Sequence, residues 1–195
     1  MSNVADNLSL AILAGGLGSR LGGVDKSKIV RNNVTQLDRW IRAWDGEVAE
    51  ILVCNRTGEA VGIAKALPDD STWEAMSGPI AGLSAAAKCA QTEWLFSMPV
   101  DTVSLPDNLL HDMLALIEPG INVIRLVDQD GPQHLIALWR VSALREQLSD
   151  AVLNDERAIW KLQQDHLTEV HHPEFHCGNL NTERDLDAFN AMKPQ

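Results

Sequence analysis

The sequence predicts an α/β fold in which a central, mostly parallel β-sheet is flanked by helices on both faces. Two observations predict it. Short apolar runs of strand length alternate along the 195 residues with segments whose apolar residues recur at helical spacing. Polar clusters directly follow three of these apolar runs, as expected where parallel strands end at a ligand-binding edge. We therefore expect one three-layer domain spanning residues 1–195.

Five apolar runs are the predicted strands of this sheet. They cover residues 8–14, 49–54, 93–100, 122–127 and 134–140. The first three are followed by a glycine-rich stretch at 15–28, by Asn55 and by Asp101, respectively. The segment DQDGPQ between the last two runs is rich in turn residues, so it should connect them as a turn.

Helical periodicity fills the intervening segments. Leu37, Trp40, Ile41 and Trp44 share one face of a helix, and Pro79 suits the first turn of another. Thr182 and Asp185 resemble a capping box that opens a last helix. The predicted helices cover residues 35–44, 79–91, 106–117, 142–152, 156–165 and 183–192.

Composition excludes several classes of function. The formal net charge of −11 disfavours general binding to nucleic acid or to anionic lipid. The three cysteines are odd in number and far apart, which suits free thiols in a reducing cytoplasm. No apolar run approaches the roughly 18 residues that a membrane span needs, and the polar N-terminus does not resemble a signal peptide. We therefore expect a cytoplasmic protein without nucleic-acid or membrane partners.

The stretch AILAGGLGSRLGGVDKSK (11–28) predicts a phosphate-binding loop. It places five glycines and then Lys26 directly after a buried strand. Glycine lets backbone N–H groups approach phosphate oxygens closely, and a lysine neutralises phosphate charge. The dinucleotide pattern GxGxxG fails because Leu21 stands at its last position. The P-loop pattern fails because Asp25 precedes Lys26 where glycine is required.

The pattern that fits is LAGGxxxRLGGxDK, and further motifs accompany it in order. They are CNR (54–56), PDDS (68–71), GPIAGL (78–83), MPVDTVSLP (98–106), ERAIWKL (156–162) and NLNTERDL (179–186). Together they resemble the molybdenum cofactor guanylyltransferases, the MobA family, a branch of the nucleotide-diphospho-sugar transferase-like nucleotidyltransferases.

This resemblance implies a three-layer Rossmann-like fold and a magnesium-dependent reaction. The family joins GMP from GTP to the phosphate of molybdopterin and releases pyrophosphate. The resemblance implies a nucleotide-binding part at about 8–105 and an acceptor-binding part at about 106–195. It also implies GTP and molybdopterin as substrates, Mg²⁺ as cofactor, and other molybdenum-cofactor proteins or apo-molybdoenzymes as protein partners.

The resemblance also implies a set of site residues. Lys26, Arg20 and Asp101 would act in catalysis, with Asp101 as the Mg²⁺ ligand. The residues expected to bind GTP are Leu13, Ala14, Gly15, Gly16, Gly22, Gly23, Lys26, Asn55 and Asp70. The residues expected on the molybdopterin side are Arg157, Asn179 and Asn181.

Several of these residues also have a plain structural interpretation. Asp70 has a competitor in the adjacent Asp69, and Asn55 suits the end of a strand. Asn181 suits a turn before the last helix, and Arg157 suits a solvated helix face. The six tryptophans are core residues by default, and Trp73 and Trp139 are the two that a flat ligand could contact. Both interpretations stay open at the level of the sequence.

The chain departs from the family pattern at 30–37, at Val103, at 133–135 and at 183–184. None of these departures touches Lys26 or Asp101, but several lie toward the predicted acceptor side. Two alternatives therefore stay open. The first is a diverged nucleotidyltransferase that uses another nucleotide or acceptor, such as one that transfers CMP to molybdopterin. The second is a nucleotide-binding module without catalysis.

Overall fold

A computed structural model of the protein describes residues 4–15, 17–18, 24–55, 58, 62–73 and 78–191. Within them, a sheet of seven strands forms the centre of the molecule. In spatial order the strands are β11 (Leu167–His171), β9 (Val123–Asp128), β10 (Gly131–Arg140), β8 (Trp94–Pro99), β1 (Leu8–Leu13), β6 (Glu50–Cys54) and β7 (Lys65–Leu67). The expected α/β architecture is confirmed.

Most neighbouring strands run parallel. The first strand, β1, lies between β8 and β6 and pairs in parallel with both, and β7 and β11 also join their neighbours in parallel. The exception is β10, which is antiparallel to β8 and to β9. The carboxyl ends of β1, β6 and β8 therefore meet at one edge, where the polar clusters were expected.

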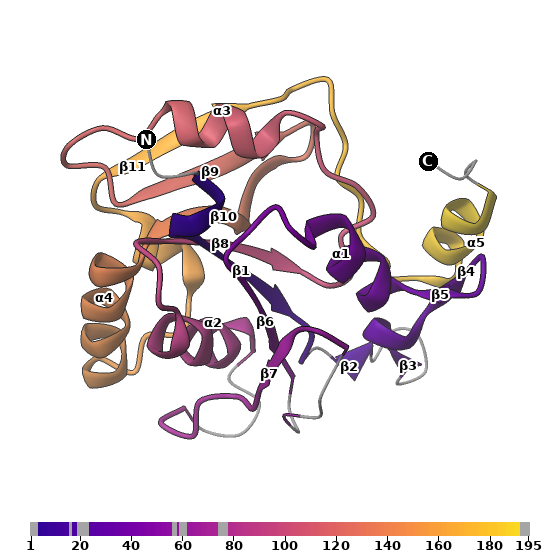
Figure 1. Ribbon diagram of the computed structural model, residues 1–195, viewed down its shortest axis with the longest axis horizontal. Helices are drawn as coiled ribbons and strands as arrows, with labels where there is room; N and C mark the ends of the chain where they lie inside the picture. The colour runs from indigo at the N-terminus through magenta and orange to yellow at the C-terminus, as the bar shows by residue number, and fades with distance from the viewer. Residues whose placement is uncertain are drawn as a thin grey trace.

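Helices cover both faces of the sheet (Figure 1). They are α1 (Gln36–Trp44), α2 (Pro79–Cys89), α3 (Leu109–Ala115), α4 (Val141–Leu153) and α5 (Glu183–Ala191). The alternation of β1 explains the two faces: Leu8, Leu10 and Ile12 pack in the core under α1 and α3. Ala11 and Leu13 pack in the core under α2 and α4.

A third, smaller apolar cluster lies outside the two main cores. It joins Ile29, Leu180 and Phe189. Ile29 directly follows the short 3-10 helix η3 (Lys26–Lys28), and Phe189 belongs to α5. The start of α5 is fixed by the predicted capping box, in which Asp185 N–H donates to Thr182 Oγ1 and Thr182 N–H donates to Asp185 Oδ2. The cluster thus fastens the end of the glycine-rich stretch to the C-terminal segment.

Two short hairpins lie beside this cluster. One pairs β2 (Leu17–Gly18) with β3 (Val24–Asp25), and the other pairs β4 (Val30–Arg31) with β5 (Val34–Thr35). Asn32 and Asn33 turn the second hairpin with φ of 52° and 62°, the left-handed values that a two-residue type I′ turn requires. Asparagine tolerates these values, so the turn needs no glycine.

The predicted helix at 156–165 is wrong, because the segment forms only the 3-10 helix η4 (Ile159–Gln163). Two features explain the difference. Asp155 has a left-handed φ of 48°, and Ala158 is extended with ψ of 112°, so neither residue has helical backbone angles. The predicted helix at 106–117 is shorter than expected, because α3 begins only at Leu109.

Two edge strands and a short 3-10 helix complete the described structure. The edge strands β7 and β11 were not predicted. The 3-10 helix η1 (Val4–Asn7) precedes β1. Among the described residues, no helix has the length and apolarity needed to cross a bilayer.

Candidate active site

A cavity of about 680 Å³ opens at the carboxyl edge of β1, β6 and β8. This volume lies within the range of roughly 300–1,000 Å³ that is usual for small-molecule sites. The residues that line it are Leu13, Gly15, Lys26, Cys54, Asp69, Gly78, Pro79, Gly82, Pro99, Val100, Asp101, Pro132, Gln133, His134, Leu135, Ile136, Asn179 and Asn181. They come from both halves of the chain.

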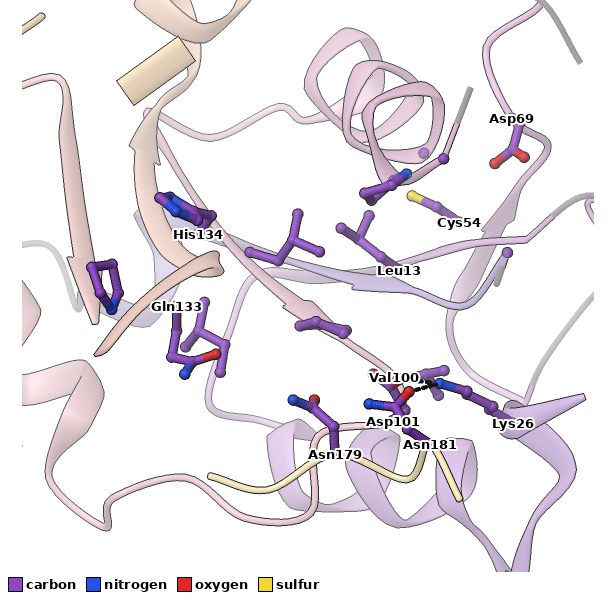
Figure 2. Close-up of a pocket in the computed structure, with 18 residues that line it drawn as sticks. Leu13, Lys26, Cys54, Asp69, Val100, Asp101, Gln133, His134, Asn179 and Asn181 are labelled. Atoms are coloured by element: carbon purple, nitrogen blue, oxygen red, sulfur yellow. Dashed lines mark hydrogen bonds and ion pairs between the residues drawn. The ribbon is translucent and has the colours of Figure 1, made fainter. Parts of the chain in front are cut away.

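The charged centre of the cavity joins three side chains that are far apart in sequence (Figure 2). Lys26 Nζ donates to Asp101 Oδ2 and to Asn181 Oδ1, each at 2.5 Å. The Lys26 and Asp101 side chains keep 13% and 17% of their surface exposed, so the pair faces the cavity without being sealed off. Two of the residues expected to act in catalysis therefore share one cavity.

Backbone contacts set the position of Asp101 and Asn181. The N–H of Leu180 donates to the carbonyl of Asp101 at 3.0 Å, and Thr102 pairs with Asn179 as an isolated antiparallel bridge. Asn181 N–H donates to Asp185 Oδ2, which ties it to the start of α5. These contacts hold both asparagines against the carboxyl end of β8.

Helix α1 fixes the segment after Asp101 from the other side. The Gln36 side chain donates to the Thr102 carbonyl at 2.7 Å, and Trp40 Nε1 donates to the same oxygen at 3.1 Å. The backbone N–H of Gln36 donates to the carbonyl of Ile29, three residues after Lys26. One helix thereby sets the spacing between the lysine and the carboxylate.

The opposite wall of the cavity is formed by the start of α2 against β1 and β6. A Cβ on Gly82 would lie 3.1 Å from Cys54 Cβ and 3.4 Å from Leu13 Cδ2, so glycine permits the close approach. Burial raises the pKa of the Cys54 thiol, and the nearby Asp69 charge raises it further. Cys54 is therefore a packing residue here and not a nucleophile.

Asp69 and Asp70 are adjacent in the sequence, but their carboxylates lie in different environments. Asp69 lines the cavity, whereas Asp70 does not. Asp70 accepts hydrogen bonds from Ser84 Oγ at 2.5 Å and from Lys88 Nζ at 2.6 Å on the outer side of α2. Burial by itself raises the pKa of Asp70, but the bonds from Lys88, Ser84 and Thr72 outweigh it and hold the pKa well below its usual range.

The cavity ends at a segment that the sequence did not assign to the site. Pro132, Gln133 and His134 from β10 line this far end, together with Leu135 and Ile136. Figure 2 shows Gln133 and His134 across the cavity from Lys26 and Asp101. The signal that could have located this segment was its departure from the family pattern at 133–135.

Of the other expected GTP-binding residues, Leu13 and Gly15 line the cavity, but Ala14 and Asn55 do not. The N–H of Ala14 donates to the carbonyl of Cys54. Asn55 Oδ1 accepts the N–H of Gly58 at 2.5 Å, as a turn residue after β6 does. The remaining expected residues, Gly16, Arg20, Gly22 and Gly23, lie outside the described residues.

Of the residues expected on the molybdopterin side, Asn179 and Asn181 line the cavity and Arg157 does not. Arg157 pairs with Asp155 two residues before it, at 3.0 Å, and 40% of its side chain is exposed. Trp73 and Trp139 are both buried and neither lines the cavity. The two tryptophans therefore belong to the core.

A second group of possible metal ligands, Asp128, Asp130 and His176, lies near the far end of the cavity. Both carboxylate oxygens of Asp128 already have protein partners. Oδ1 accepts from the Asp130 N–H and from Gln133 Nε2, and Oδ2 accepts from the Cys177 N–H. We therefore interpret Asp128 as a buried anchor for the start of β10.

The chain is similar to known proteins over most of its length. The model of the MobA-like NTP transferase domain matches residues 10–170. A molybdenum cofactor guanylyltransferase of Acidiphilium cryptum is 34% identical over 143 residues, which is 70% of this chain and 69% of that protein. A molybdenum cofactor guanylyltransferase of Yersinia pseudotuberculosis is 27% identical over 154 residues, which is 78% of each.

Solved structures share the fold at lower identity. Molybdopterin-guanine dinucleotide biosynthesis protein A from Archaeoglobus fulgidus superposes with a TM-score of 0.72 at 19% identity, covering 93% of this chain and 96% of that one. The 2-C-methyl-D-erythritol 4-phosphate cytidylyltransferase from Thermus thermophilus gives 0.72 at 17% identity, covering 94% and 97%. With the domain match and the relative at 34% identity, the chain belongs to the MobA-like NTP transferase family and is a nucleotidyltransferase.

Proposed function

We propose that the protein transfers GMP from GTP to the phosphate of molybdopterin, which forms the guanine dinucleotide cofactor and releases pyrophosphate. One observation carries this proposal: Lys26 and Asp101 meet in a single cavity that both halves of the chain line. The relatives named molybdenum cofactor guanylyltransferase support the choice of nucleotide and acceptor.

The nucleoside would lie against the start of α2 and the end of β1. Leu13 and Gly15 offer an apolar contact and open backbone there, and Gly82 leaves room for a flat base. We assign the nucleoside contact to Asp69 in place of Asp70, because only Asp69 lines the cavity. The roles of Ala14, Gly16 and Asn55 stay predictions.

The triphosphate would lie along the glycine-rich stretch toward Lys26. Attack of a phosphate oxygen on an α-phosphate brings anions together, so the site must mainly align them and neutralise charge. Lys26 provides a point charge for the leaving pyrophosphate. Arg20, Gly22 and Gly23 complete this cradle in the proposal.

The donor set around Asp101 fits Mg²⁺, a hard cation that prefers oxygen ligands. The Asp101 carboxylate and the Asn181 amide oxygen converge there, and the Lys26 ammonium group already occupies the position as a positive charge. Asp101 would hold the ion. A bound Mg²⁺ would neutralise phosphate charge and help to align the reacting groups.

The acceptor would enter from the second half of the chain, as the proposed division near residue 105 implies. Asn179, Asn181 and the start of β10 line that side of the cavity. Arg157 does not line the cavity, so it stays a candidate only if its segment takes a different position. Small-molecule substrates suit a cavity of this size.

The proposal extends to location and partners. We propose a cytoplasmic enzyme that binds neither nucleic acid nor membranes, because a net charge of −11 disfavours binding to anionic surfaces. Apo-molybdoenzymes, or other proteins of the same cofactor pathway, are the protein partners we propose.

The test is to incubate the protein with each of the four nucleoside triphosphates, Mg²⁺ and molybdopterin, and to identify the product by mass. We expect the guanine dinucleotide and pyrophosphate. Formation of the cytosine dinucleotide would show that CTP, and not GTP, is the substrate. GTP binding without any pyrophosphate release would favour a non-catalytic nucleotide-binding module.

A further inference from the structure

A side-chain amide lies at the far end of the cavity, where the pairing of β10 with β9 becomes irregular. Gln133 pairs with Leu126, and the next pair joins Ala137 to Arg125, so the register shifts between these two pairs. Such bulges re-aim side chains and are frequent beside active sites. Gln133 lines the cavity directly before the shift, and it is one of the residues at which the chain departs from the family pattern.

A buried carboxylate holds one end of this amide. Gln133 Nε2 donates to Asp128 Oδ1 at 2.8 Å, and the backbone N–H of Asp130 donates to the same oxygen at 2.9 Å. The other oxygen, Oδ2, accepts the backbone N–H of Cys177 at 3.0 Å. Asp128 keeps only 4% of its surface exposed. Its carboxylate is thus surrounded by donors, and Gln133 supplies one of them.

The charge of Asp128 determines which atom of the amide faces it. Burial raises the pKa of Asp128, but the hydrogen bonds from Cys177, Gln133 and Asp130 outweigh burial and lower the pKa. The carboxylate is therefore ionised at neutral pH and can only accept hydrogen bonds. A carboxamide has both of its donors on nitrogen and none on oxygen. The Gln133 nitrogen must face Asp128, because the reverse orientation would place oxygen against oxygen.

The oxygen of the Gln133 amide is then left for the cavity. Among the residues that the structure describes, no hydrogen bond ends at Gln133 Oε1, although Gln133 lines the cavity. In Figure 2 this oxygen lies on the side of the amide toward Asn179 and Asp101. Gln133 Oε1 is thus a hydrogen-bond acceptor in the cavity wall, fixed in orientation from behind.

Asp128 also ties this acceptor to the segment that carries Asn179. Cys177, whose N–H donates to Asp128, lies two residues before Asn179. The Cys177 carbonyl accepts the backbone N–H of Ser104 at 3.0 Å. Burial and the Asp128 charge raise the pKa of the Cys177 thiol to about 12, so the thiol stays protonated and also donates to the carboxylate. One anion therefore fixes the Gln133 amide and the Asn179 segment relative to each other.

We propose that Gln133 Oε1 accepts a hydrogen bond from a ring N–H or amino group of the acceptor molecule, and that Asp128 is the positioning residue that keeps this oxygen toward the cavity. The inference rests on the proposed function, which assigns this end of the cavity to the acceptor. A reduced pterin carries such donors at the end away from its phosphate. The contact would disfavour an acceptor that presents a carbonyl there, because two acceptor oxygens repel each other.

Two probe molecules test the contact without any turnover. Pterin carries a ring N–H and an amino group, whereas 1,3-dimethyllumazine has the same fused rings with carbonyl and N-methyl groups and no N–H donor. We expect Gln133→Met to weaken pterin binding about 10-fold, because the donor loses its partner, and to leave dimethyllumazine binding unchanged. Titrations followed in ¹⁵N–¹H spectra measure both dissociation constants. An equal loss for both probes, or no binding of pterin to the wild-type protein, would overturn the inference.

Gln129→Met is the matched control. Gln129 is exposed in the turn between β9 and β10 and does not line the cavity. The control should leave both dissociation constants unchanged, and a loss of pterin binding equal to that of Gln133→Met would show an indirect effect of the turn. Thermal melting checks that each variant folds.

The positioning role of Asp128 has its own measurements. An asparagine could hold either end of the Gln133 amide, so we expect Asp128→Asn to reduce the preference for pterin over dimethyllumazine severalfold, and an unchanged preference would remove this role. In the wild-type protein, the two side-chain N–H signals of Gln133 should lie further apart than those of Gln129, because one N–H faces a carboxylate. Equal spacing would contradict the orientation even if the asparagine variant does not fold.

The proposed function and this inference can fail separately. If the wild-type protein makes no dinucleotide with molybdopterin, the proposed function fails, while the pterin titration still decides the role of Gln133. If it does make the dinucleotide, Gln133→Met should raise KM for molybdopterin about 10-fold and leave KM for GTP unchanged. An equal rise in both KM values would show a structural role and overturn the inference.

Discussion

Each end of the cavity is built on a pair of opposite charges, but the two pairs are placed differently. Lys26 and Asp101 line the cavity and stand where substrate would lie. Arg125 and Glu169 stand behind the far end, where Arg125 contacts both Gln163 and the ring of His134. In the proposed function the first pair would open for phosphate and metal to bind, whereas the second is a fixed support for the Gln163 side chain.

The comparison shows how one type of contact serves two purposes. The segments that carry Lys26 and Asp101 are held by the contacts of Gln36 with the Ile29 and Thr102 carbonyls, so the two charged side chains are free to exchange partners. Arg125 is held inside the sheet by its strand and by three side chains. We therefore expect substitutions at the first pair to alter turnover and substitutions at the second to alter stability.

The largest expected effect is that of Asp101→Asn on turnover. The substitution keeps the shape and one oxygen for Lys26 but removes the charge that would hold the metal ion. We expect the rate of pyrophosphate release to fall about 10³-fold or more, with the melting temperature nearly unchanged. Retention of more than a tenth of the wild-type rate would remove Asp101 from the proposed metal site.

Arg125→Met should have the largest effect on stability. It removes one contact of the buried Gln163 oxygen and leaves the Glu169 carboxylate with only the His171 ring, at 3.5 Å. Breaking a buried pair costs roughly 3–5 kcal/mol, and the 31% exposure of Glu169 favours the lower end. Urea unfolding measures the free energy. Lys26→Met is the matched comparison: Asp101 faces the cavity, where water can solvate it, so we expect a smaller loss, and an equal or larger loss would contradict the comparison.

The sequence predicted most of the central sheet and the charged centre because their signals are local. An apolar run such as 8–14 and the polar residues after it need no distant partner to be interpreted. The edge strands β7 and β11 were missed, because short strands with partly exposed faces lack a continuous apolar run. The helix at 156–165 was expected from periodicity, which does not register a left-handed residue such as Asp155.

The far end of the cavity could not be predicted for a different reason. The position of His134 depends on Gln163, 29 residues later, and on Arg125 in the neighbouring strand. The choice between Asp69 and Asp70 likewise depends on Ser84 and on which side of α2 each carboxylate meets. Such pairings are set by the packing of the sheet and helices, which no local pattern contains.

Gly82→Ala tests a third region, the wall of the cavity at the start of α2 that we assign to the nucleoside. The new Cβ would lie 3.1 Å from Cys54 Cβ, which forces α2 to move by a few tenths of an ångström. We expect a loss of about 1 kcal/mol in stability and a rise of roughly 10-fold in the dissociation constant of GTP, measured by calorimetry. KM for molybdopterin should not change. A change in that parameter alone would show that the two ends are reversed.

The smallest expected effect concerns Asp70, whose ion pair lies outside the cavity. Its lowered pKa means that the ionised form stabilises the fold, so this stability is present above the unfolded value of about 4 and is lost as the pH falls toward the lower folded value.

Asp70→Asn should therefore lower the free energy of unfolding by about 1 kcal/mol at pH 7, discounted for the exposed Lys88, and the difference from wild type should shrink as the pH falls below about 4. Urea unfolding at pH 7, 5 and 3 measures it. Asp69→Asn is the paired control: it should weaken GTP binding at pH 7, whereas Asp70→Asn should not. If only Asp70→Asn weakened GTP binding, the nucleoside contact would return to Asp70, as the sequence alone had indicated.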